Sequence, residues 1–152
     1  MNYWLMKTEP STFGLEDLAS RQGQTEPWDG VRNYQARNMM RDQMAVGDQV
    51  FFYHSNCEVP GIVAIAEIVR GGYPDPTAFD PDSRYFDPKS RPEQPTWYLV
   101  DVRLVRPLRR MIALSELKTV PELADFTLLR PGNRLSVMPV DPLHWQHILE
   151  RE

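Results

Sequence analysis

The segment from Trp97 to Val105 constrains the fold most, because every second residue along it is apolar for the full length of a strand. These residues are Tyr98, Val100, Val102 and Leu104. Successive side chains of a β-strand point to opposite faces of the sheet. The segment therefore predicts a strand with one face toward a core and the other face, with Asp101 and Arg103, toward polar surroundings.

Four other segments have the composition of strands, and they are widely separated along the chain. They are residues Tyr3–Glu9, Gln49–His54, Gly61–Val69 and Arg134–Val140. Because these strands pair over long sequence distances, we expect a curved or closed sheet.

Short helical segments fall between these strands. Pro10-Ser11-Thr12 is expected to open a first helix, and Asn33 to cap a second helix whose apolar face carries Ala36, Met40 and Met44. Further helical pieces are predicted at 114–117 and 121–124, and Asp141-Pro142 starts a terminal helix that runs to about Leu149. The sequence thus predicts an α+β protein with five to six strands and three to four short helices, folded as one domain over residues 1–152.

Composition excludes several classes of function. Apolar residues make up 41% and charged residues 25%, as in an ordinary globular protein, and no apolar run approaches the ~18 residues of a membrane helix. A net charge of −4 is evidence against a protein that holds nucleic acid by general phosphate neutralisation, although not against one that reads a single exposed nucleotide. The lone Cys57 excludes an internal disulfide, and with no signal peptide recognisable at the start, a cytoplasmic monomer without a membrane partner is expected.

The stretch from Pro27 to Asn38 is the strongest indication of a binding site. It combines Trp28 and Tyr34 with two arginines and several amide side chains, a mixture that leaves too many polar groups to satisfy in a core. Flat rings that stack on a planar ligand, next to amides and guanidinium groups that bind its edge, suit one wall of a pocket. We therefore expect recognition chemistry here.

The segment from Gly71 to Pro95 is rich in proline and has no regular pattern. It contains the aromatic residues Tyr73, Phe79, Tyr85 and Phe86. Loops of this length in a compact domain tend to be functional or disordered, and the aromatic residues favour an ordered loop over a site.

Catalytic and metal-binding arrangements are weak in this sequence. His54 with Cys57, and His144 with His147, have spacings compatible with metal ligands, but a zinc site needs four donors. No metal and no cofactor is expected. Asp80 and Asp82 keep open an alternative, a small-molecule hydrolase or transferase acting on nucleoside-like substrates. A protein-interaction barrel without a pocket ligand is a third possibility.

Several segments together resemble the EVE domain, a family of the PUA-like superfamily that is related to the YTH readers of methylated adenine. The resemblance rests on the start at Tyr3–Ser11, on 28–38, on 53–56, on 85–90, on 97–102 and on 134–140. It implies a PUA-like β-barrel whose pocket admits a modified base. Arg32 stands where a YTH cage tryptophan is expected, which leaves Trp28 or Tyr34 to supply the ring and makes a modified cytosine a candidate beside adenine.

The resulting hypothesis is a non-catalytic module, not an enzyme, that binds a modified nucleobase in DNA or RNA, or the free modified base. Trp28, Tyr34 and the Tyr85-Phe86 pair are the candidates for stacking. Lys7, Asn33 and Ser55 are expected to bind polar edges, and Arg32 and Arg134 to contact phosphate or hold the pocket open. Replacing Trp28 with alanine is expected to remove binding and leave the melting temperature nearly unchanged.

Overall fold

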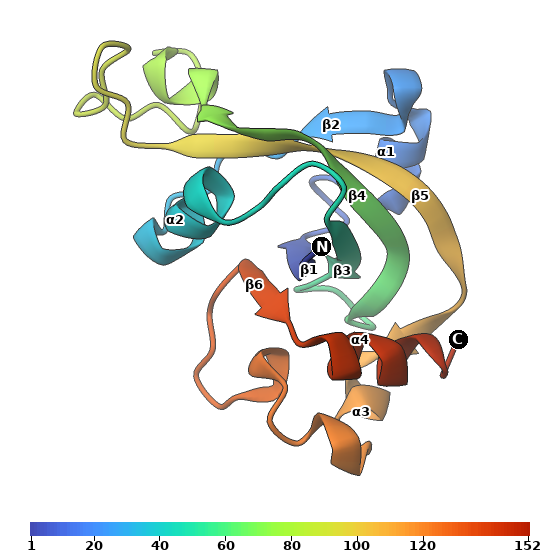
Figure 1. The fold of residues 1–152 in the computed structure, drawn as a ribbon. Helices are drawn as coiled ribbons and strands as arrows, with labels where there is room; N and C mark the ends of the chain where they lie inside the picture. Colours follow the sequence, from blue (N-terminus) through green and yellow to red (C-terminus); the bar gives the residue numbers. More distant parts are fainter.

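A six-stranded mixed sheet forms the centre of the molecule, with the strand order β2-β5-β4-β3-β1-β6. The computed structural model describes residues 1–152. The strands are β1 (Tyr3–Thr8), β2 (Thr25–Pro27), β3 (Gln49–His54), β4 (Gly61–Pro74), β5 (Tyr98–Ala113) and β6 (Val137–Val140). Strands β1 and β3 are parallel and the other pairs are antiparallel. Figure 1 shows β4 and β5 as long, strongly bent strands that curl around the rest of the sheet.

The sheet is curved, but it is not closed into a barrel. Its edge strands, β2 and β6, each pair with a single neighbour, β5 and β1 respectively. The register between β4 and β5 shifts at several points between Ile62 and Tyr73, and such bulges bend a strand pair. The expected strand number and curvature are confirmed, whereas closure of the barrel is not, because β2 is only three residues long and pairs no further.

Four α-helices surround the sheet, and three of them, which start at Tyr34, Leu114 and Pro142, begin at the predicted residues. The helices are α1 (Leu15–Ser20), α2 (Tyr34–Asp42), α3 (Leu114–Leu117) and α4 (Pro142–Leu149). Asn33 caps α2, since its Oδ1 accepts the Ala36 N–H at 2.9 Å. Asp141 caps α4 in the same way, followed by Pro142 in the first turn.

The start of α1 differs from the prediction. Pro10, Ser11 and Thr12 form a turn, and the helix begins only after Gly14, whose N–H donates to the Asp17 carboxylate at 2.7 Å. The helical piece predicted at 121–124 is a 3₁₀ turn at Pro121–Leu123. Three further 3₁₀ turns, at Gln22–Gln24, Pro76–Phe79 and Thr127–Leu129, were not predicted.

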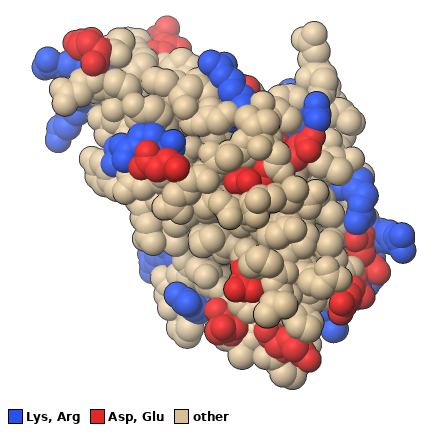
Figure 2. Space-filling view, viewed as in Figure 1, with Lys and Arg blue, Asp and Glu red and all other residues tan.

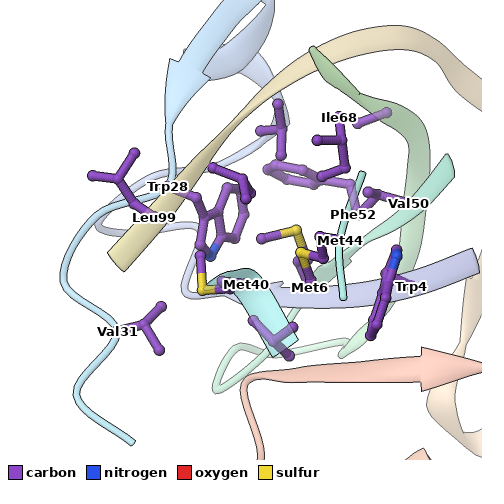
Figure 3. Packing of buried hydrophobic residues seen from close by; sticks show 14 of the residues in the cluster. Trp4, Met6, Trp28, Val31, Met40, Met44, Val50, Phe52, Ile68 and Leu99 are labelled. Atoms are coloured by element: carbon purple, nitrogen blue, oxygen red, sulfur yellow. The ribbon is translucent and has the colours of Figure 1, made fainter. Parts of the chain in front are cut away.

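Hydrophobic residues pack on both faces of the sheet. On β1, Trp4 and Met6 belong to the first cluster, the α2-side core, while Leu5 belongs to the second, the α4-side core. Figure 3 shows the α2-side core, where the Trp28 ring lies among Phe52, Met40 and neighbouring residues. The α4-side core is built around Phe51 and Trp145, whose rings stack at 3.7 Å.

Candidate functional site

A cavity of about 660 Å³ opens to solvent beside the α2-side core. This volume falls within the roughly 300–1,000 Å³ of small-molecule sites. Most of its lining comes from three segments far apart in the sequence: the end of β1, the residues from β2 to Arg32, and the loop at Arg84 and Tyr85. The lining residues are Lys7, Thr8, Glu9, Thr12, Phe13, Arg21, Glu26, Pro27, Trp28, Asp29, Gly30, Val31, Arg32, Arg84, Tyr85 and Ser136.

The Tyr85 ring lies directly against the backbone of Gly30. Gly30 has a φ of +79°, and a Cβ atom there would lie 2.4 Å from the Cζ of Tyr85. A side chain at this position would therefore be strained by its backbone and would displace the ring. Gly30 is required for Tyr85 to occupy the cavity wall.

Arg32 fastens the loop that carries Tyr85. Its Nε and Nη2 donate to the Tyr85 carbonyl at 3.2 and 2.7 Å, Nη1 donates to the Val31 carbonyl and to Asp75, and Nη2 also reaches Thr77. A guanidinium has five N–H donors, and all of them have partners inside the protein. Arg32 therefore holds the wall in place and has no donor left for a phosphate.

Asp75, which is fully buried, connects Arg32 to the Gly30 turn. Its carboxylate accepts the Gly30 N–H at 2.9 Å, the Arg32 guanidinium at 3.1 Å, and both the N–H and the hydroxyl of Thr77. Burial alone would raise the pKa of Asp75, but these hydrogen bonds outweigh it and the pKa is lowered. The carboxylate therefore stays ionised and joins the Gly30 turn to the loop.

Two titratable groups on the cavity wall have shifted pKa values. Burial, together with the nearby charges of Asp75 and Glu26, raises the pKa of Asp29. Burial lowers the pKa of Lys7. The Asp29 carboxyl and the Lys7 amine are an acceptor and a donor that are both partly desolvated. They suit recognition of a polar ligand edge, because hydrogen bonds to such groups are stronger than in water.

The structure brings Lys7, Trp28, Arg32 and Tyr85 together at the cavity, as the sequence predicted. Trp28, however, is only 8% exposed and packs edge-on against Phe13 and Phe52, at 6.4 and 5.7 Å between ring centres. It is part of the α2-side core as well as of the wall. The expectation that Trp28→Ala leaves the melting temperature nearly unchanged is therefore wrong.

The remaining predicted residues lie outside the lining of this cavity. The Asn33 oxygen is engaged as the cap of α2, and Tyr34, 61% exposed, stacks on Trp97 at 4.9 Å. Ser55 follows β3, where its N–H donates to the Thr8 carbonyl. Phe86 is 39% exposed beside Tyr85, and Arg134 precedes β6. Ligand contacts by these residues stay predictions.

Neither the His and Cys pairs with metal-ligand spacing nor Asp80 and Asp82 line the cavity. The structure contains no group of three or more His, Cys, Asp and Glu side chains that could hold a metal ion. The Asp80 carboxylate accepts the Asp82 N–H at 2.9 Å, which is the geometry of a turn, and neither residue lines the cavity. His54 accepts the Leu15 N–H through its Nε2 at 3.1 Å, at the start of α1.

Comparison with known proteins identifies the family. The EVE domain model matches residues 2–151. This chain belongs to the EVE domain family. Mouse thymocyte nuclear protein 1 is 44% identical over 168 residues, which cover 99% of this chain and 74% of the relative.

Solved structures agree with the assignment of this EVE domain. A protein from Pseudomonas putida with a crystal structure is 49% identical in sequence, and its structure superposes with a TM-score of 0.92 over 97% of each chain. A crystal structure of human THYN1 protein in complex with 5-methylcytosine-containing DNA is 40% identical, with a TM-score of 0.93 over 99% of this chain and 97% of that chain.

The comparisons also correct the predicted location. The vertebrate relatives are named thymocyte nuclear protein 1, a name that places those proteins in the nucleus and contradicts the cytoplasmic location expected here from the lone cysteine. Nuclear and cytosolic thiols are both kept reduced, so the cysteine argument could not separate the two. No helix in this EVE domain has the length and apolar character needed to cross a membrane.

Sequence reasoning missed several residues that form the site of this EVE domain. Asp29 and Gly30 lie inside the segment singled out for recognition, and the turn of Trp28-Asp29-Gly30 was the available signal. Asp75 had no local signal, because its partner Arg32 is 43 residues away. Ser136 reaches the cavity because its carbonyl accepts the Lys7 N–H of β1, a long-range pairing that local patterns do not encode. Phe13 reaches it from the turn after β1, where its N–H donates to the Glu9 carbonyl.

Proposed function

We propose that this EVE domain binds a modified nucleobase, with modified cytosine as the first candidate, and releases it unchanged. The observation that carries the proposal is the cavity wall in which Gly30, Arg32 and Asp75 hold the Tyr85 ring in place before any ligand binds. A preorganised ring and polar groups reduce the entropy lost on binding. The human relative crystallised with 5-methylcytosine-containing DNA supports the choice of ligand.

Tyr85 is the proposed stacking partner of the base. Stacking of one base on an aromatic ring contributes about 1–3 kcal/mol. Asp29 and Lys7 then bind the polar edge of the base, since they are the partly buried acceptor and donor of the cavity. The apolar side chains of Val31 and Phe13 offer surface for a methyl group. A base in a duplex would have to be flipped out to enter, at a cost of a few kcal/mol.

The test is a titration of the protein with single-stranded oligonucleotides that differ only in cytosine or 5-methylcytosine at one central position. Trp28 lines the cavity, so intrinsic tryptophan fluorescence reports occupancy. We expect tighter binding of the methylated strand and recovery of the intact modified nucleoside after incubation. Equal affinity for the two strands would contradict the proposal, and turnover of the nucleoside would favour the hydrolase or transferase alternative.

Tyr85 and Phe86 provide a matched pair of variants. Tyr85→Ala should remove most of the preference for the methylated strand, because it deletes the ring that faces the cavity. Phe86→Ala deletes a neighbouring exposed ring that does not line the cavity, and should leave the preference intact. An equal loss in the two variants would mean that Tyr85 acts through the loop and not through stacking.

A further inference from the structure

Guanidinium groups and aromatic rings alternate in a row that leads away from the cavity. Arg84 lies over the Tyr85 ring at 4.7 Å, and Tyr34 stacks on Trp97 with an angle of 28° between the planes. In spatial order the row consists of Arg84, Tyr85, Arg32, Trp97, Tyr34 and Arg37. We refer to these six residues as the cation–aromatic row. Its first three members line the cavity.

The far end of the row reaches a second hollow. Arg37, which lies over Tyr34 at 5.1 Å, is part of the wall of this space of about 440 Å³. We call it the basic hollow, and its lining consists of Arg37, Lys89, Arg91, Gln94, Pro95 and Thr96. Three of these side chains are cationic and none is a carboxylate.

The three cations of the basic hollow form no ion pair with a carboxylate. Lys89, Arg91 and Arg37 differ in this respect from Arg21, Arg41, Arg103, Arg106, Arg110 and Arg151, which all pair with carboxylates. In a chain of net charge −4, this is a local concentration of unpaired positive charge. Figure 2 shows lysine and arginine side chains, with carboxylates beside them, at the upper left of the molecule, where Figure 1 places the loop between β4 and β5.

Arg37 is oriented for a ligand in the hollow. Its Nη1 donates to the Thr96 carbonyl at 2.7 Å and its Nε to the Asn38 side chain at 2.9 Å, so α2 and the loop before β5 fix the guanidinium together. Its Nη2 has no partner in the protein. A fixed guanidinium with free donors is suited to phosphate oxygens.

We infer that the basic hollow binds phosphodiester groups of the same nucleic-acid strand whose base occupies the cavity. This inference rests on the proposed function, because the cavity sets where the strand begins. The row between the two sites supplies the exposed Tyr34 ring for contact with an intervening nucleotide. The aromatic rings of the cation–aromatic row favour a nucleic-acid strand over an acidic protein segment. An acidic segment would pair with the cations but would make no stacking contact with the rings. Phosphate contacts position a strand without reading its sequence.

The experiment measures how the affinity for short single strands changes with salt concentration, by fluorescence anisotropy. Each lost phosphate contact should reduce the slope of log K against log salt by about 0.7. Lys89→Gln and Arg91→Gln are each expected to show this reduction on strands with and without 5-methylcytosine, and to leave binding of the free modified nucleoside unchanged. Arg109→Gln is the matched control, since Arg109 is exposed on β5 and lines neither site.

The outcomes separate the inference from the proposed function. Slopes in the Lys89 and Arg91 variants that equal the slope of Arg109→Gln would overturn the inference, even if methylated strands bind more tightly than unmethylated ones. Reduced slopes on unmodified strands, without any preference for 5-methylcytosine, would keep the basic hollow as a phosphate site and refute the modified-base proposal. If the variants lose binding of a polyglutamate peptide but keep the strand slope, the hollow serves an acidic protein partner and the inference fails.

Discussion

At the scale of single residues, Trp28 has two roles that one substitution cannot separate. It lines the cavity, yet it is packed into the α2-side core with only 8% of its surface exposed. We expect Trp28→Ala to lower the free energy of unfolding by about 3–5 kcal/mol, the usual cost of removing a large buried aromatic side chain. Urea denaturation measures this loss. A loss below about 1 kcal/mol would place the indole outside the core.

His54 is the residue from which we expect a pH dependence of stability. Burial lowers the pKa of His54, and its Nε2 accepts the Leu15 N–H, which only a neutral imidazole can do. When the pH falls below about 6.5, the pKa of histidine in an unfolded chain, His54 is protonated in the unfolded state while it is still neutral in the folded state. The contribution of His54 is therefore fully present above about pH 6.5 and is lost as the pH falls from there toward its lower folded pKa.

Denaturant midpoints measured between neutral and mildly acidic pH check this sign. The control is His54→Gln, which keeps a hydrogen-bond acceptor but does not titrate. Its stability should fall less steeply with acid than that of the wild type. Parallel pH profiles would mean that His54 is not the source of the acid sensitivity.

At the scale of elements, the turn at Gly30 and the loop at Tyr85 behave as one unit, because the ring, the guanidinium of Arg32 and the Asp75 carboxylate connect them. We expect Gly30→Ala to displace Tyr85 and to weaken binding of a 5-methylcytosine strand by at least about tenfold, equivalent to about 1.4 kcal/mol. Calorimetric titration measures this change.

Gly132 offers a control for the backbone strain in that variant. Its φ of +76° is close to that of Gly30, but a Cβ atom at Gly132 would have no neighbouring atom within 4 Å. Gly132→Ala should therefore lower stability by about 1–2 kcal/mol through strain alone and leave affinity unchanged. If Gly132→Ala weakens binding as much as Gly30→Ala does, contact with Tyr85 is not the cause.

The elements differ in how well the sequence predicts them. Helices α2 and α4 were predicted from local signals, a side-chain cap followed by an apolar periodicity or a proline, and these signals lie within a few residues. Strand β2 was missed because its three residues owe their conformation to pairing with β5, about 75 residues further along the chain. The extension of β4 to Pro74 likewise depends on its partner strand.

At the scale of the whole molecule, the difference between local signals and long-range contacts also explains what was predictable about the site. The cavity residues that sit in one local segment, Trp28 and Arg32, were found from the sequence, as was the loop residue Tyr85. For Arg32 the sequence left two roles open, contact with phosphate or holding the pocket open, because the choice depends on contacts between distant parts of the chain. Arg32 is bonded to Asp75 and to the Tyr85 carbonyl, and so serves the wall and not the ligand. Composition suggests a recognition surface, but only the fold decides which donors remain free.

The two cores divide the molecule into a half that carries the cavity and a half that supports the sheet. Trp28 and Val31 are members of the α2-side core that line the cavity, whereas no member of the α4-side core does. Ile148 is fully buried near the end of α4, and we expect Ile148→Val to lower stability by about 1 kcal/mol without changing affinity for a 5-methylcytosine strand. Val31→Ala should lower stability by about 1–2 kcal/mol and also weaken binding, because it removes cavity surface.

Two measurements on both variants test this division: the melting temperature, and the affinity by calorimetry at a temperature well below the melting transition. Affinity that follows stability in the two variants alike would mean that the sheet transmits changes from one face to the other. Affinity that changes only in Val31→Ala would show that the central strands isolate the cavity from the α4-side core. The second result is expected, since the strands between the two cores pack tightly on both faces and their backbone positions are fixed by pairing on either side.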